Sequence, residues 1–234
     1  MLPDRLTLKV LRKQSGHVKL EVKVVLGLLV AALAAALVPS SAWAAPATEN
    51  MFPSSNWNKT CFDTSFGRGM NCQTDDDSVG WRAEGSIDST TNTSDTPAER
   101  WINVTMADSY DTTDLAVYFD TSPKYDGSGE TDVIYRAKAS DFAGTDFIGM
   151  TWCDDAVSSL RCDQQYVQFE DAYATDRALA CHETGHSVGL LHGENAAPRF
   201  DNQDSRLGCM VKRIVSSLKF VGANNVSNIN ATYT

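Results

Sequence analysis

The chain has 234 residues, of which 42% are hydrophobic, and it carries a net charge of −10. This apolar fraction is sufficient to build a core, which excludes a wholly disordered protein. The excess of acidic residues argues against a nucleic-acid-binding protein, because contacts to phosphate need lysine and arginine. Only four histidines are present, so a cluster of them would be informative.

The first 44 residues have the pattern of a secretory signal peptide. A basic region (1–23) precedes an uncharged apolar run (24–38), and Ala-Trp-Ala at 42–44 offers a small-residue cleavage site. The run is shorter than the roughly 20 apolar residues of a membrane span, although an uncleaved anchor helix is the alternative. We therefore predict a secreted, extracellular protein with no membrane anchor after cleavage. Residues 45–234 then carry a net charge of −14.

All six cysteines lie beyond the predicted cleavage site, at Cys61, Cys72, Cys153, Cys162, Cys181 and Cys209. An even number of cysteines in a secreted protein predicts disulfide bonds. Proximity in the sequence suggests the pairs Cys61–Cys72 and Cys153–Cys162, which leaves Cys181–Cys209, but the connectivity stays open. A cysteine-rich zinc site is the weaker interpretation, because no pair has C-x-x-C spacing.

Residues 45–95 are rich in Asn, Ser, Thr, Asp and Gly, which predicts a loop-rich N-terminal extension or a pro-segment. The main domain is expected over 96–234. It opens on Thr-Pro-Ala-Glu at 96–99, a capping box with proline at the first helical position. This predicts a helix from Pro97 to about Tyr110, although alternating apolar residues there also fit a strand.

Four short runs rich in β-branched and aromatic residues follow, and each predicts a strand. They are Leu115–Phe119, Asp132–Ala137, Phe147–Cys153 and Tyr166–Phe169. A long helix is predicted from Ala172 to Val188, and the Asn-rich tail from Gly222 to Thr234 could hold a short final helix.

A calcium site is a secondary expectation in the loop between the first two of these strands. Acidic and hydroxyl residues alternate there as calcium ligands do, at Asp126, Ser128, Glu130 and Asp132. The remainder of a calcium-loop pattern is missing, so a turn at Asp126–Gly129 explains the residues better.

The long predicted helix contains His182-Glu183-Thr184-Gly185-His186. Residues four apart share one helical face, so both imidazoles can reach one metal ion, and Glu183 can reach a water on that metal. Gly189 can adopt positive φ and turn the chain so that His192 returns to the same ion. Three neutral imidazoles with one open position suit a catalytic Zn²⁺.

The alternative is a chance motif whose histidines only pack in the core. An isolated H-E-x-x-H does arise by chance. Here, however, the three histidines of residues 45–234 all fall within this one motif. The spacing therefore favours a metal site.

This pattern resembles the signature of the metzincin metallopeptidases, H-E-x-x-H-x-x-G-x-x-H followed by a Met-turn. The fixed positions are matched by His182, Glu183, His186, Gly189 and His192. Downstream, Met210 is the only methionine after the motif and corresponds to the Met-turn residue. The resemblance extends over roughly 96–234.

The resemblance implies an α+β fold with a twisted, mostly parallel sheet, an N-terminal helix, a long zinc-binding helix, a Met-turn and a short C-terminal helix. It implies one Zn²⁺ held by His182, His186 and His192. It further implies a secreted endopeptidase that acts on protein or peptide substrates, with Glu183 as general base; we expect a monomer. An edge strand, for which Phe147–Trp152 is the candidate, would pair with extended substrate.

The resemblance also suggests a role for two cysteines, because Cys181 directly precedes the first histidine and Cys209 directly precedes Met210. A disulfide between them would clamp the zinc helix to the Met-turn. The small size, the signal peptide and the flanking cysteines resemble small secreted bacterial members related to snapalysin and the matrixins. It has His192 where snapalysin-type enzymes carry Asp, and Gly193 where matrixins carry Ser, so the subfamily and the cleavage preference stay open.

Three other functions compete with this interpretation. A zinc-binding pseudoenzyme would often have lost its base, whereas Glu183 is intact. A thermolysin-like peptidase would need a glutamate ligand on a later helix, and the only later glutamate, Glu194, lies too close to His186. An adhesive or structural disulfide-bonded protein with a chance motif would bind no zinc.

Overall fold

The computed structural model of the chain describes residues 48–88 and 96–234, and those from 48 onward belong to one compact unit. The predicted signal peptide and its cleavage site after Ala44 lie outside the described residues. Within the described ranges, no helix is both long enough and apolar enough to cross a bilayer.

A six-stranded sheet forms the centre of this unit. Its parallel body has the order β5-β4-β6-β8, formed by Ala116–Phe119, Ser78–Ala83, Val133–Ala137 and Arg161–Phe169. The short β3 (Gln73–Thr74) also pairs with β8 in parallel. Only β7 (Gly149–Ala156) runs antiparallel, along β8. The prediction of a mixed α/β chain with a mostly parallel sheet is confirmed.

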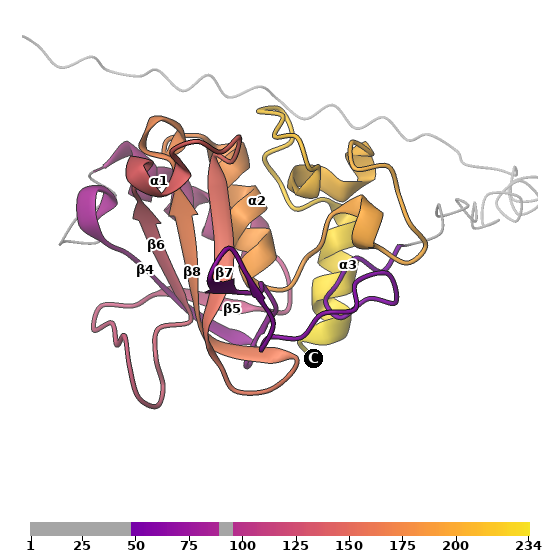
Figure 1. The fold of residues 1–234 in the computed structure, drawn as a ribbon, viewed down its shortest axis with the longest axis horizontal. Coiled ribbons are helices and arrows are strands. Elements are labelled where there is room, and N and C mark those ends of the chain that lie inside the picture. Colours follow the sequence, from indigo (N-terminus) through magenta and orange to yellow (C-terminus); the bar gives the residue numbers. More distant parts are fainter. Residues whose placement is uncertain (1–47, 89–95) are drawn as a thin grey trace, which may run out of the picture. The chain divides into compact units, whose positions relative to one another are not determined.

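Three α-helices of the described residues accompany the sheet. Helix α1 (Pro97–Thr105) begins as predicted, because the Thr96 side chain accepts a hydrogen bond from the Glu99 amide, and it continues as a π-helical turn to Tyr110. Helix α2 (Arg177–Ser187) packs against α1, β7 and β8. Helix α3 (Ala223–Thr232) lies at the C-terminal end of the chain, in yellow in Figure 1.

Apolar side chains from the sheet and from α1 and α2 form the main core. Its largest fully buried members include Tyr110, Tyr135, Phe169, Ile102, Met106, Leu179 and Met210. This core fixes α2 against β7 and β8, and α2 is the helix that carries the histidine motif.

The start of α2 differs from the prediction. We expected the helix from Ala172, but Asp171–Tyr173 form a separate 3₁₀ turn. The α-helix begins at Arg177 because the Asp176 side chain accepts hydrogen bonds from the amides of Ala178 and Leu179. The four predicted strands, the α1 region and the short final helix are all present, with shifted ends.

Described residues of the predicted segment 45–95 belong to the same sheet as residues of 96–234. Strand β4 comes from the first segment, yet it pairs with β5 on one side and β6 on the other. Its residues Val79, Trp81 and Ala83 are buried in the main core. Removing 45–95 as a pro-segment would therefore take out an interior strand of the sheet.

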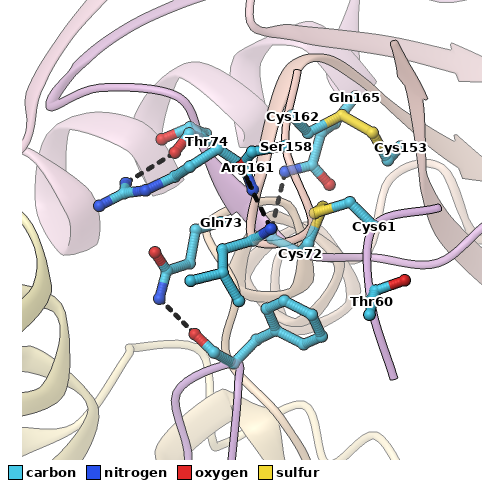
Figure 2. The surroundings of a disulfide bond; sticks show 12 residues. Thr60, Cys61, Cys72, Gln73, Thr74, Cys153, Ser158, Arg161, Cys162 and Gln165 are labelled. Carbon is cyan, nitrogen blue, oxygen red and sulfur yellow. Dashed lines mark hydrogen bonds between the residues drawn. A yellow bond between two sulfur atoms is a disulfide. The ribbon is translucent and has the colours of Figure 1, made fainter. Parts of the chain in front are cut away.

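The three cysteine pairs are those that proximity in the sequence suggested: Cys61–Cys72, Cys153–Cys162 and Cys181–Cys209. The first two disulfides lie side by side (Figure 2), and the sulfur atoms of Cys72, Cys153 and Cys162 are all within 4.8 Å of one another. With Phe52 and Leu191 they form a second small core. This core joins the N-terminal segment to β7 and β8.

Candidate metal centre

The three histidines of the motif converge as their spacing predicts. Helix α2 places the Nε2 atoms of His182 and His186 3.1 Å apart. The chain then turns at Gly189, whose φ of +92° brings His192 back, with its Nε2 3.0 Å from that of His182 and 3.2 Å from that of His186. A side chain at Gly189 would also press on Met51, whose sulfur lies 2.9 Å from the position of a Cβ. Glycine is therefore required there for both space and conformation.

The outer ring nitrogens determine which atoms face the centre. His182 Nδ1 lies 2.8 Å from the carbonyl oxygen of Cys209, and His186 Nδ1 lies 2.8 Å from that of Leu190. A carbonyl oxygen only accepts, so both Nδ1 atoms carry the proton and both Nε2 atoms present lone pairs. Lone pairs that face one another at this distance repel, and a cation between them removes that repulsion.

The geometry of the three nitrogens fits a small metal ion. A tetrahedral zinc site with Zn–N bonds of about 2.0–2.1 Å separates its nitrogens by about 3.3 Å, and the separations here are 3.0–3.2 Å. The backbone carbonyls on Nδ1 are the kind of partner that orients metal-binding imidazoles. The residues present can therefore hold a metal through His182, His186 and His192.

Burial keeps these imidazoles neutral. Desolvation and the nearby His186 lower the pKa of His182 to about 3, and desolvation lowers the pKa of His186 to about 4. The pKa of His192 is lowered further by burial and by the other two rings. Neutral imidazoles are the form that binds metal, so the centre is ready for an ion at neutral pH.

Glu183 faces the edge strand β7. Its carboxylate Oε2 lies 2.8 Å from the hydroxyl of Thr151, and a Cβ on Gly149 would come 2.5 Å from its Oε1. Gly149 thus leaves room for the carboxylate, and Thr151 orients it. Burial raises the pKa of Glu183 to about 7, and the hydrogen bond from Thr151 opposes that rise. A carboxylate with such a pKa can both take up and release a proton near neutral pH.

Met210 lies against the middle of the motif helix. A Cβ on Gly185 would clash with the Met210 sulfur, and Met210 itself is fully buried. The Cys181–Cys209 disulfide ties the same two segments together, one residue away from His182 and from Met210. Gly208 permits this approach, because its φ is +53° and a side chain there would strike the backbone of Val221.

A cleft of about 410 Å³ opens over the histidines and Glu183. One wall is β7 with the residues that precede it. The other walls are residues 65–71 of the N-terminal segment and the side chains of Lys212 and Ile214 after Met210. The sequence had indicated neither the N-terminal wall nor Thr151. The pattern Gly149-x-Thr151 indicates only that the two residues share one face of a strand, and not that this face meets Glu183.

The predicted calcium ligands do not come together as one group. Glu130 lies with Asp155 and Asp163, whereas Asp132 lies with Asp75 and Asp76. Burial raises the pKa of Asp132 to about 8, while its hydrogen bond from the Gly80 amide lowers it. Exposed carboxylates often cluster without an ion, so Ca²⁺ stays a prediction.

Comparison with known proteins adds no assignment: no family model matches the chain, and a search of the curated proteins found no match. Its function therefore has to be argued from the site.

Proposed function

We propose that the chain is a secreted zinc-dependent endopeptidase of the metzincin type. The observation that carries this proposal is the convergence of three buried, neutral imidazoles at 3.0–3.2 Å, in a cleft that also contains the carboxylate of Glu183. Met210 beneath Gly185 and the turn at Gly189 support it, because they occupy the positions that the metzincin pattern assigns to them.

His182, His186 and His192 would hold the ion. When bound, zinc would supply a Lewis acid that polarises the peptide carbonyl and activates a water. Glu183 would take a proton from that water and deliver it to the leaving amine. Thr151 would keep the Glu183 carboxylate aimed at the cleft. The pKa of about 7 for Glu183 suits a group that must both accept and release a proton.

Substrate would bind as an added strand along the outer edge of β7. This strand lies at the cleft and pairs with β8 on its inner side. Backbone hydrogen bonds to an edge strand hold an extended peptide with little dependence on its sequence. Protein and peptide substrates fit this arrangement better than a small, compact molecule.

The test combines metal content with cleavage of casein by the purified protein. We expect one zinc per chain and zinc-dependent cleavage that a chelator abolishes. Glu183→Gln should retain zinc and lose about 10²–10⁴-fold in kcat, whereas His186→Ala should lose the zinc. Glu84→Gln, outside the cleft, is the matched control and should change neither quantity.

Two results would refute the proposal in different ways. Zinc at one per chain without cleavage of casein or of a peptide library would favour a zinc-binding pseudoenzyme. Absence of bound zinc would favour a disulfide-bonded structural or adhesive protein.

A further inference from the structure

The loop between Cys61 and Cys72 has a rigid base beside the cleft. Both cysteines are buried, and their disulfide lies against the Cys153–Cys162 bond, as Figure 2 shows. The side-chain amide of Gln165, on β8, donates to the Cys72 carbonyl oxygen at 2.8 Å and also to the Ser187 carbonyl at the end of α2. The loop is thereby tied to the sheet and to the histidine-bearing helix.

The tip of this loop is a tight hairpin that exposes an aromatic ring. Strands β1 (Thr64–Ser65) and β2 (Arg68–Gly69) are joined by Phe66 and Gly67, with φ of +53° and +75°. Turns with two positive φ values favour Asn, Asp and Gly, and a bulky side chain is disfavoured there. Phe66 is nevertheless 76% exposed, so burial of its ring adds little stability to offset the unfavourable backbone conformation.

The Phe66 ring reaches across to the chain that leads into β7. Its centroid lies 5.7 Å from that of Phe147, in an edge-to-face arrangement. Phe147 is itself 46% exposed, and both rings line the cleft that contains His182 and Glu183. Two exposed aromatic rings at the mouth of this cleft form a surface suited to a large apolar side chain.

The loop between Cys61 and Cys72 also limits how far β7 can pair with another strand. The Ile148 carbonyl accepts a hydrogen bond from Glu170 after β8, so the alternate residues Gly149, Thr151 and Cys153 direct their backbone groups outward. The Cys153 amide already donates to the Met70 carbonyl at 3.1 Å. Within residues 48–88 and 96–234, Gly149 and Thr151 are therefore the only residues of β7 at the cleft whose outward backbone groups remain available for pairing with a peptide.

Arg68 holds the hairpin in this position. Its guanidinium lies 4.1 Å from the centre of the Trp152 ring, and it forms an ion pair with Asp141 at 2.7 Å. The hairpin thus contacts β7 through both side chains and backbone.

We propose that the loop between Cys61 and Cys72 is the wall of the cleft that selects the substrate. An extended peptide pairs with Gly149 and Thr151, and the loop ends this strand pairing at Cys153. The rings of Phe66 and Phe147 then receive a large apolar side chain of the peptide. This inference rests on the proposed function, since it concerns the peptide bound at the same centre.

Binding is measured separately from cleavage. Zinc-loaded Glu183→Gln protein is titrated with fluorescein-labelled decapeptides that differ at one position, which carries Phe, Leu, Ala or Asp. We expect the Phe and Leu peptides to bind more tightly than the Ala and Asp peptides. Adding Phe66→Ala should weaken the binding of the Phe and Leu peptides about tenfold, which is about 1.4 kcal/mol. The affinity for the Ala peptide should change by less than about twofold.

Two further variants separate substrate contact from structure. Phe62→Ala removes an aromatic ring that is 63% exposed on the same loop but outside the cleft, and it should change no affinity. Phe66→Asn places a residue that favours positive φ at the turn. This variant should raise the unfolding temperature or leave it unchanged. It should nevertheless weaken the binding of the Phe and Leu peptides as much as Phe66→Ala does.

The outcomes distinguish this inference from the proposed function. If zinc is bound and casein is cleaved but Phe66→Ala behaves like Phe62→Ala, the inference is overturned and the peptidase stands. If Phe66 governs peptide affinity while the parent protein, with Glu183 intact, cleaves nothing, the binding wall stands and the peptidase falls. If no peptide binds at all, the inference is overturned.

Discussion

Met210 occupies the space that a side chain at Gly185 would need. Gly185 directly precedes His186, so the segment that carries Met210 is in contact with the part of α2 that carries the histidines. The adjacent Cys209 carbonyl accepts from His182 Nδ1 at 2.8 Å. One short segment therefore both packs against the helix and orients its first histidine.

This contact predicts the sign of a helix substitution. Gly→Ala inside a helix normally stabilises by about 1 kcal/mol, but Gly185→Ala should destabilise by about 1–3 kcal/mol, because the buried Met210 has nowhere to move. Met210→Ala alone should cost about 2–5 kcal/mol by leaving a cavity. The double variant should lose less than the sum of the two, as measured by urea unfolding. Strict additivity would show that the two residues do not share this space.

The hydrogen bond from Thr151 predicts a shift in the pH profile. Glu183 must be ionised to accept a proton, and its pKa is about 7, raised by burial and opposed by Thr151. Thr151→Val removes the opposing contribution, so the pKa should rise, and the acidic limb of kcat/KM should move upward by about one unit. Thr232→Val, which loses a hydrogen bond inside α3, is the control and should leave the profile unchanged. An unshifted limb in Thr151→Val would mean that this hydroxyl does not act on Glu183.

The disulfides should differ in what they contribute to stability and to metal binding. Loop entropy predicts losses of about 3.5 kcal/mol for Cys181–Cys209 and about 2.5 kcal/mol for Cys153–Cys162 on replacement by serine pairs, since they close separations of 28 and 9 residues. Only the Cys181/Cys209 pair should also weaken zinc binding, because it fixes the segment that orients His182. Metal titration with a competing chelator checks this, and equal zinc affinity in both double variants would contradict it.

The zinc-free protein should lose stability in acid through its histidines. Their pKa values are about 3 for His182 and about 4 for His186, against an ordinary 6.5, and that of His192 is also lowered. The unfolded chain therefore binds protons first, and stability present above pH 6.5 is lost as the pH falls toward 4 and then 3. Glu183, with its raised pKa, opposes this trend, since its contribution is lost as the pH rises through about 7. Asp132, whose pKa burial raises to about 8, opposes the trend as well. Between pH 5 and pH 4 the carboxyls become protonated in the unfolded chain too, so the histidines dominate there, and chelator-treated protein should melt at lower temperature at pH 4 than at pH 5.

The structural features that the sequence predicted correctly are those that depend on residues close together in the chain. The capping box at Thr96 started α1, and the spacing of His182, His186 and His192 predicted their convergence. Strand β4 was missed because Gly80 interrupts its apolar pattern. In the structure the Tyr118 ring on β5 lies over this glycine, 2.8 Å from the position of a Cβ.

The surroundings of the site depend on contacts between distant segments. Thr151 meets Glu183 only because β7 packs against α2, and Phe66 reaches the cleft only because the Cys61–Cys72 loop lies beside β7. No periodicity or spacing in either segment expresses that meeting. The meeting of the three histidines was therefore predictable from the sequence, whereas the group that orients the Glu183 carboxylate and the cleft wall that faces it were not.

The turn at Gly189 is held from both ends of the described chain. The Phe52 amide donates to the Gly189 carbonyl at 2.7 Å, and the Tyr233 hydroxyl donates to the Val188 carbonyl at 2.9 Å. A growing polypeptide acquires the second of these bonds only after α3 has left the ribosome. Synthesis order thus leaves the turn at Gly189 without its second anchor until translation has passed Tyr233.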